Sequence, residues 1–213
     1  FSSSNNNTVS GNTAGSNLIH GIYLNASSND TLTSNTINSN SQAGIYLNGS
    51  SNNTLTSNTA SSNALNGIYL FSSSNNNTVA SNTANSNASA GIYLNGSSNN
   101  TLSGNRASSN SYSGIYLNGS ADNMVVQNDV RSNTEYQIYI IGASSSDTVQ
   151  KNNIVPSGTN PDSGVYNGST IVTNKFTFSR NWWNSTDTGR IKKVIFHAGG
   201  GDSVIWQTFR LGQ

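Results

Sequence analysis

The acidic side chains are the first candidates for chemistry in this sequence. Cleavage of a sugar chain needs carboxylates gathered at one cleft, one acting as acid and another as base or nucleophile. Residues 1–121 contain a single acid, Asp30. The one possible group lies later and comprises Asp122, Asp129, Arg131, Glu135, Asp147 and Lys151. A lyase-like site with Arg131 or Lys151 as base is one interpretation and a solvated edge is the simpler one, so we assign no catalytic residue.

The sequence contains few residues that could bind a metal ion or a nucleic acid. His20 and His197 lie far apart, neither has a histidine partner two or four residues away, and the chain has no cysteine. Copper or zinc would need more ligands than this, so we expect no metal and no cofactor. Only 8% of residues are charged and the net charge is +1, which excludes the basic footprint of nucleic-acid binding. No apolar run approaches the roughly 20 residues that span a bilayer.

A row of tyrosines is the more regular candidate for binding. The tetrapeptide GIYL begins at Gly21, Gly44, Gly67, Gly91 and Gly114, with weaker copies at Gln137 (QIYI) and Gly164 (GVYN). In a strand its Ile and Leu point to one side and its Tyr to the other. The outward stripe would contain Tyr23, Tyr46, Tyr69, Tyr93, Tyr116 and Tyr139. It could hold sugar rings or a neighbouring rod, or it could only stabilise the sheet.

Glycosylation is a second surface hypothesis. The sequon N-x-S/T occurs at Asn6, Asn25, Asn29, Asn48, Asn52, Asn76, Asn87, Asn95, Asn99, Asn118, Asn167 and Asn184. The composition makes many matches accidental, but these positions fall at expected turns, where an acceptor would be exposed. They are compatible with a glycosylated extracellular rod.

The spacing of GIYL predicts the fold that must position these side chains. Its copies are 23, 23, 24, 23, 23 and 27 residues apart, which is typical of a repeat architecture. Each unit offers short apolar pieces separated by Asn, Gly and Ser, whereas a helical repeat would need apolar residues at i, i+3, i+4 and i+7. Three short strands per unit predict an all-β, right-handed parallel β-helix of about seven to eight coils.

Two asparagine rows keep the same period. They run Asn12, Asn35, Asn58, Asn82, Asn105, Asn128, Asn152 and Asn17, Asn40, Asn63, Asn87, Asn110, Asn133. Stacked side-chain amides can hydrogen-bond from one coil to the next. We therefore interpret both rows as structural ladders.

The later part of the chain departs from the repeat. We expect regular coils over 1–154, an irregular last coil with a loop excursion over 155–181, and a C-terminal cap over 182–213, because solenoids need their ends covered. In the cap, Ser185 or Thr186 would start a short helix carrying Ile191, Val194 and Ile195, with Gly199 to Gly201 ending it. A last strand lies within 202–211, and the anchors would be Trp182, Trp183 and Trp206.

The unit NGIYLxxSSNNTLxxNxxxxN resembles the repeats of the NosD-like family, also described as carbohydrate-binding and sugar-hydrolase β-helices. The ending NWWNSTD…RIKKVIF…DSVIWQTF is similar to the closing segment of repeat-rich archaeal and bacterial surface proteins, with Asn184 where a Gly is usual. The resemblance covers nearly the whole chain and implies a parallel β-helix. It says little about function, because this fold serves enzymes, adhesins and spacers.

The leading hypothesis is a non-enzymatic structural or adhesive module at the cell surface. Residues 1–9 repeat 71–79, where they follow GIYL, so the first coil lacks a strand and we expect head-to-tail self-association or strand donation into a filament. The alternative is a polysaccharide-binding or polysaccharide-degrading β-helix. A remote one is ice binding, because threonine rows recur at Thr8, Thr31, Thr54, Thr78, Thr101 and at Thr13, Thr36, Thr59, Thr83.

Overall fold

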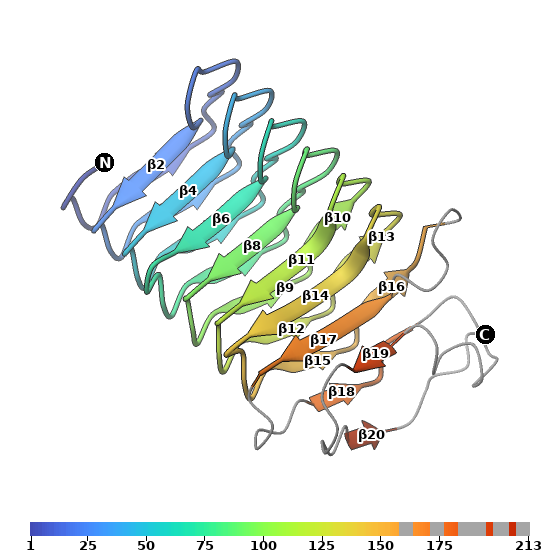
Figure 1. Ribbon diagram of the computed structural model, residues 1–213. Helices are drawn as coiled ribbons and strands as arrows, with labels where there is room; N and C mark the ends of the chain where they lie inside the picture. The colour runs from blue at the N-terminus through green and yellow to red at the C-terminus, as the bar shows by residue number, and fades with distance from the viewer. Residues whose placement is uncertain (158–163, 171–176, 183–194, 198–204, 208–213) are drawn as a thin grey trace.

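The protein is a solenoid of about seven turns built from parallel strands. The computed structural model describes residues 1–157, 164–170, 177–182, 195–197 and 205–207. Successive coils lie on one another along a single axis, with the N-terminus in the first coil (Figure 1). Every regular element in these ranges is a strand, so the all-β parallel fold expected from the repeat is confirmed.

The first sheet is formed by the GIYL segments. Its strands are β2 (Ile22–Asn25), β4 (Ile45–Asn48), β6 (Ile68–Phe71), β8 (Ile92–Asn95), β11 (Ser113–Asn118), β14 (Tyr136–Gly142), β17 (Val165–Ser169) and β19 (Ile195–His197), in that spatial order. Equivalent residues pair, so Tyr23 lies beside Tyr46 and Tyr46 beside Tyr69. This register stacks the inward Ile and Leu and the outward Tyr of the GIYL copies in columns, whereas the position after Leu varies and holds Phe71 between Asn48 and Asn95.

The second sheet follows the first turn of each coil. It comprises β1 (Thr8–Ser10), β3 (Thr31–Thr33), β5 (Thr54–Thr56), β7 (Thr78–Ala80), β9 (Thr101–Ser103), β12 (Met124–Val126), β15 (Thr148–Gln150), β18 (Thr177–Ser179) and β20 (Ile205–Gln207). β3 and β5 each carry two outward threonines in the pattern T-x-T. The sequence analysis found no T-x-T spacing within one strand, which is wrong. Of the two threonine rows of the remote ice-binding alternative, the first begins strands of this sheet, whereas the second lies at single bridges outside the strands.

The third sheet is short. Within the described residues, only β10 (Arg106–Ser108), β13 (Asp129–Arg131) and β16 (Asn153–Val155) pair as strands on this side. In the earlier coils the same side is held by single bridges that link Thr13, Thr36, Thr59, Thr83 and then Arg106. The side therefore becomes a continuous strand ladder only where the sequence departs from the repeat.

The core is a narrow stack of Ile, Leu, Val and Ala side chains, nearly all with no solvent exposure. The glycine that opens GIYL is required by this narrowness. A Cβ on Gly67 would lie 2.7 Å from the carbonyl oxygens of Ala60 and Gly91 and 2.8 Å from the Asn87 amide nitrogen. Backbone and ladder thus occupy the space that any side chain there would need.

The asparagine ladders join the coils at the corners, where the strands end. The Asn82 backbone N–H donates to Asn105 Oδ1 (2.9 Å), and its Nδ2 donates to the Leu55 carbonyl (2.8 Å) and to Asn105 Oδ1 (3.1 Å). Asn82 Oδ1 in turn accepts from the backbone N–H and Nδ2 of Asn58. The Asn82 side chain therefore pairs a backbone N–H and a backbone C=O of the preceding coil and also bonds the ladder side chain of the next coil.

Both predicted ladders are confirmed, and each runs further than expected. The first continues from Asn152 to Asn181. The second ends on Gln137, whose Oε1 accepts from the Asn133 N–H and Nδ2. The sequence analysis missed a third ladder, which contains Asn7, Asp30, Asn53, Asn77, Asn100, Asn123 and Asp147. It also missed a serine row in which each backbone N–H donates to the hydroxyl of the next coil.

The cap prediction is wrong at one point. Ile195 was expected on a helix that continued to the glycines, but Ile195–His197 form strand β19, which pairs with β17. Pairing with an open sheet edge satisfies a row of backbone groups that a helix would leave unpaired. The predicted last strand is present as β20, whereas 183–194 and 198–204 lie outside the described residues. No helix in the described part is long and apolar enough to cross a membrane.

The first coil exposes apolar side chains. Leu18 and Ile19 are 88% and 58% exposed, and Phe1 is 50% exposed. Self-association through this end stays a prediction.

Replacing Asn82 by Ala should destabilise the rod by about 3 to 5 kcal/mol, because it leaves the buried Asn58 N–H, the Asn58 side-chain amide and the Leu55 carbonyl without their partner. Chemical denaturation followed by circular dichroism measures this. The control is Asn76→Ser, since Asn76 is exposed with a φ of 56° and Ser146 has a φ of 55° in the equivalent turn. Equal stability of both variants would contradict a structural role for the ladder.

Candidate functional site

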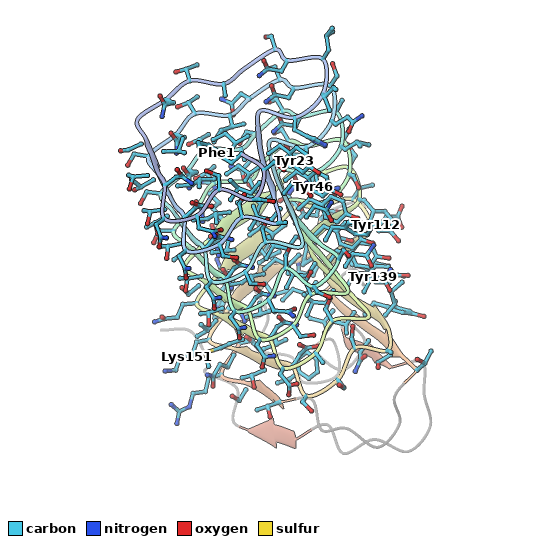
Figure 2. All side chains as sticks on the ribbon, turned by 90° about the vertical axis from the view of Figure 1, so that its left-hand side faces the viewer. Phe1, Tyr23, Tyr46, Tyr112, Tyr139 and Lys151 are labelled. Carbon is cyan, nitrogen blue, oxygen red and sulfur yellow. The ribbon has the colours of Figure 1, made fainter. Side chains whose placement is uncertain are left out.

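The tyrosines form one continuous stripe along the first sheet, as expected (Figure 2). Neighbouring ring centroids from Tyr23 to Tyr116 are 4.4 to 5.2 Å apart, and their planes differ by 2° to 17°. Tyr23 is exposed and the others are half-buried. Strand spacing explains the geometry, since parallel strands bring equivalent residues to about this distance.

This stacking limits what the first part of the stripe can bind. Rings that lie flat on one another cover each other's faces, and an aromatic side chain contacts a sugar through its ring face. What stays open is a line of ring edges and hydroxyl groups, bordered by amides: Asn48 Nδ2 donates to the Tyr23 hydroxyl (3.4 Å) and Asn95 Nδ2 to the Tyr69 hydroxyl (3.3 Å). Here the stripe chiefly stabilises the sheet.

The stripe changes where the repeat degrades. The planes of Tyr116 and Tyr139 differ by 41°, and those of Tyr139 and Tyr166 by 51°. Two more tyrosines join them: Tyr136, the first residue of β14, stacks on Tyr139 at 4.8 Å, and Tyr112, just before β11, meets Tyr139 edge-on at 5.6 Å. We call Tyr112, Tyr116, Tyr136, Tyr139 and Tyr166 the aromatic cluster.

The sequence analysis missed three members of this cluster. Tyr166 lies in the weak copy GVYN, which was counted as a repeat but not as part of the stripe. Tyr112 and Tyr136 lie outside the GIYL register, so periodicity could not find them. The available signal was their replacement of small residues, because Ser89 and Ala90 occupy the equivalent positions one and two coils earlier.

Five phenols of the stripe and the aromatic cluster hold their protons more tightly than an ordinary tyrosine. Burial is the largest cause and raises the pKa of Tyr46, Tyr69, Tyr112, Tyr116 and Tyr136 above the ordinary value of 10.0. Neighbouring tyrosines add to the rise, and Tyr112 also shares a hydrogen bond with Tyr139. At neutral pH the stripe is therefore an uncharged surface of hydrogen-bond donors and acceptors.

Alkaline titration should reveal this property. Because the phenol pKa values are higher in the folded chain than the 10.0 of an unfolded one, the stability that the phenols contribute should be complete below pH 10 and should be lost as the pH rises above it. Phenolate absorbance and circular dichroism, followed together, measure ionisation and unfolding. A complete titration centred on pH 10 with the sheet signal intact would contradict the prediction.

The acidic residues do not gather at one cleft. Asp122 lies in the turn before β12, Asp129 in β13, and Glu135 in the segment before β14, so they occupy three different corners of the coil. Asp129 is bound to Arg131, whose Nε lies 2.8 Å from Asp129 Oδ1. The group suggested by sequence proximity is therefore dispersed around the rod.

Asp147 is a ladder residue. It is fully buried, and its Oδ1 accepts from the backbone N–H (2.8 Å) and Nδ2 (3.0 Å) of Asn123. Its Oδ2 has no hydrogen-bond partner. Burial raises the pKa of the Asp147 carboxyl to about 7, against the two hydrogen bonds from Asn123 that lower it and with a smaller rise from Asp122.

Asp147→Asn should make the rod more stable at pH 8, by up to about 4 kcal/mol. The folded pKa of about 7 lies above the ordinary 3.8, so the wild type should lose stability as the pH rises from about 4 to about 7, and the variant should not. Thermal unfolding between pH 4 and pH 8 tests this. The exposed Glu135→Gln serves as control, and a parallel pH dependence in wild type and Asp147→Asn would refute the assignment.

The sequons fall into groups of different accessibility. Asn6, Asn29, Asn52, Asn76 and Asn99 are exposed in turns, with φ between 56° and 61°. Asn25, Asn48, Asn95 and Asn118 are half-buried, and the serine of each sequon is fully buried. Asn87 is a buried ladder residue and Asn167 is 2% exposed, whereas Asn184 lies outside the described residues. Among the described sequons, only the first group combines an exposed acceptor Asn with a threonine that is not buried, and its occupancy stays a prediction.

His20 belongs to the stripe and not to a metal site. Its ring lies 4.6 Å from that of Tyr46, and its Nδ1 accepts from the Ala43 N–H at 3.3 Å. Burial lowers its pKa. In the described part of the chain no three His, Cys, Asp or Glu side chains gather to hold a metal ion. These residues do not fit a copper centre.

Several solved structures share this fold. The A-module of the Azotobacter vinelandii mannuronan C-5 epimerase AlgE4 matches with a TM-score of 0.78 at 15% identity, covering 92% of this chain and 57% of that one. An alginate lyase from Paenibacillus sp. str. FPU-7 gives 0.70 at 13% identity, covering 96% and 80%. The periplasmic alginate epimerase AlgG gives 0.62 at 19% identity, covering 97% and 45%. The chain thus spans about half the length of these epimerases.

The sequence comparisons agree with the fold. No significant match was found among curated protein sequences. A model described as a right handed beta helix region matches residues 1–84, which confirms the expected handedness. The model of NosD, described as a periplasmic copper-binding protein, matches residues 43–194. Since that match covers well over half of the sequence, the chain belongs to the NosD family.

Proposed function

We propose that this protein is a non-catalytic, glycan-binding β-helix that works in the periplasm or at the cell exterior. The observation that carries the proposal is the aromatic cluster at the C-terminal end of the tyrosine stripe. Its rings come from β11, β14, β17 and the segment before β11, and they lie at angles of 41° to 85° to several of their neighbours.

Tilted rings leave parts of their faces open, whereas the stacked rings of the earlier coils cover each other's faces. An open phenol face can pack against the C–H face of a pyranose, and a protonated hydroxyl beside it can donate to or accept from a sugar hydroxyl. The stripe then continues the contact along the rod axis with hydroxyls and Asn amides. A polymer that runs parallel to this axis would meet similar hydroxyl and amide groups at each coil.

The fold neighbours support the choice of ligand class. AlgE4 and AlgG are named as epimerases of mannuronan and alginate, and the Paenibacillus protein as an alginate lyase. AlgG and NosD are both described as periplasmic. These names belong to proteins that share the fold, and for this chain they support a polysaccharide ligand and a location outside the cytoplasm.

The carboxylates support binding without cleavage. Asp30 and Asp147 are buried within a ladder, and Asp129 is bound to Arg131. An acid and a base that act on one glycosidic bond must face each other across the substrate, whereas Asp122 and Glu135 lie at different corners. Copper binding is not part of the proposal, because His20 packs among tyrosines and no ligand set surrounds it in the described residues.

The test compares wild type with the double variant Tyr112→Ser, Tyr136→Ala. Each change installs the residue that an earlier coil holds at the same position, Ser89 or Ala90, so the fold should persist. Calorimetric titration with hexamers of β-1,4-glucose, β-1,4-mannose and α-1,4-galacturonate should show binding of at least one, weakened about tenfold in the variant by loss of two aromatic contacts.

Leu65→Ser is the matched control, because Leu65 is an exposed apolar residue in the same row as Tyr112 but away from the cluster. It should bind like the wild type. No binding of any hexamer would overturn the proposal. Cleavage of the bound hexamer, measured by product chromatography and lost in Asp129→Asn or Glu135→Gln, would replace it by the enzymatic alternative.

A further inference from the structure

The positive charges of this protein are confined to one part of the chain. All nine Lys and Arg residues lie at or after Arg106. Four of them fall in the described residues: Arg106, Arg131, Lys151 and Arg180. All four lie on the third side of the coil or on the turn that leads into it, and we call this surface the basic corner.

Register places these four residues on consecutive coils. Arg106 opens β10 and pairs with Asp129 of β13, which pairs with Asn153 of β16. Lys151 and Arg180 each lie two residues before the next members of this column, Asn153 and Trp182, which bridge to one another. Arg131 lies two residues after Asp129. Each coil therefore supplies one cation, and the four lie within about four positions of each other along the coil.

One residue of the basic corner is held in place. Arg131 donates from Nε and from a second guanidinium nitrogen to Asp129 Oδ1, and Asn153 Nδ2 donates to the same oxygen at 2.7 Å. The Arg131 side chain is 41% exposed. A guanidinium carries five N–H donors, so after these two bonds it still has donors for a ligand. Asp129 offsets one positive charge and leaves the corner with an excess of three.

The positions of the other charged and aromatic groups separate the basic corner from the aromatic cluster. Asp122 and Glu135 lie at the other two corners, and Asp147 is buried, so among the described residues the only carboxylate on the basic corner is Asp129. Trp182, in the column of Arg106 and Asn153, is 37% exposed. Figure 2 shows Lys151 on the opposite side of the rod from Tyr112 and Tyr139. The basic corner is therefore a surface separate from the aromatic cluster.

We propose that the basic corner binds an acidic polysaccharide whose carboxylates lie along the rod axis. A polyuronate carries one carboxylate on each sugar, and the basic corner carries one cation on each coil. Coils rise by about 4.8 Å, which is close to the length of one pyranose unit in an extended chain. The Trp182 indole supplies an aromatic surface for a sugar at the end of the row.

The chemistry favours a polyuronate over a nucleic acid. Four cations and one carboxylate make a weak field, and the chain's net charge is only +1, whereas nucleic-acid sites carry a dense basic surface. The proposal extends glycan binding, the proposed function, to a second surface. It rests on that function only for the class of ligand, and the two surfaces can be tested separately.

The test uses the triple variant Arg106→Thr, Lys151→Gln, Arg180→Ser. Each new residue already occupies the same position in another coil. Thr83 bridges to Arg106. Gln127 has the φ of Lys151, 56°, and Ser81 has the φ of Arg180, 55°. The ligand is polygalacturonate, compared with its methyl-esterified form, which keeps the backbone and loses the charges. Biolayer interferometry at low and high salt gives the affinities.

The wild type should bind polygalacturonate at least about tenfold more tightly than the ester, and high salt should weaken this binding because it screens exposed charges. The triple variant should lose about tenfold in affinity, as three exposed ion pairs are removed. The control is Asn29→Asp, Asn52→Asp, Asn76→Asp, which changes the net charge equally in an exposed turn row that already holds Asp122. It should keep most of the affinity.

Three outcomes would overturn the proposal: equal binding of the ester, an equal loss in the control, or tighter binding of a DNA duplex than of polygalacturonate. The double variant Tyr112→Ser, Tyr136→Ala separates this result from the proposed function. If only that variant loses glycan affinity, the aromatic cluster is the binding surface and the basic corner is not.

Discussion

The structure depends on hydrogen bonds made by buried side chains at the corners of the coil. Strands pair their own backbone groups, but a coil of 23 or 24 residues must turn three times, and each turn leaves N–H and C=O groups that no strand reaches. An Asn side chain is long enough to accept one N–H and donate to one C=O while it stacks on its neighbour, as Asn82 does with the Asn58 N–H and the Leu55 carbonyl. Buried polar groups must be paired in this way, since an unpaired one costs about 1 to 3 kcal/mol.

This constraint explains the unusual composition. The corners require Asn and Ser, and the adjacent turn residues adopt positive φ, as at Asn52, Ser57 and Ser62. The core admits little beyond Ile, Leu, Val and Ala because the coil is narrow. Burial in a ladder disfavours a charged side chain, as Asp147 illustrates. It keeps the hydrogen bonds of its row through one oxygen, while burial raises the pKa of its carboxyl to about 7.

The same constraint locates the distinctive surfaces. The early coils repeat one another, and their tyrosines stack flat, so they present a uniform face. From the fifth coil the outward positions change while the inward ones hold: Arg106 replaces a threonine, Tyr112 and Tyr136 replace small residues, and Arg131 and Lys151 appear. The ladders continue beneath them as far as Asn181. A rod of this kind can therefore vary its surface coil by coil without loss of the fold.

The sequence by itself determined the architecture, because a repeat of fixed length forces equivalent residues into register. The parallel β-helix, the inward Ile and Leu, the outward tyrosines and two of the ladders all follow from counting. It did not reveal the third ladder, because its row of asparagines is interrupted by Asp30 and ends at Asp147. It also predicted a helix through Ile195, where an open sheet edge is instead paired.

Only the tertiary structure decided which side chains share a surface. Asp122, Asp129 and Glu135 are close in sequence, yet they lie at three corners because the chain turns between them. Conversely, Arg106 and Arg180 are 74 residues apart and lie on one side of the rod, since each coil returns the chain to the same corner. Ring tilt in the aromatic cluster depends on packing between neighbouring coils, and periodicity carries no information about it.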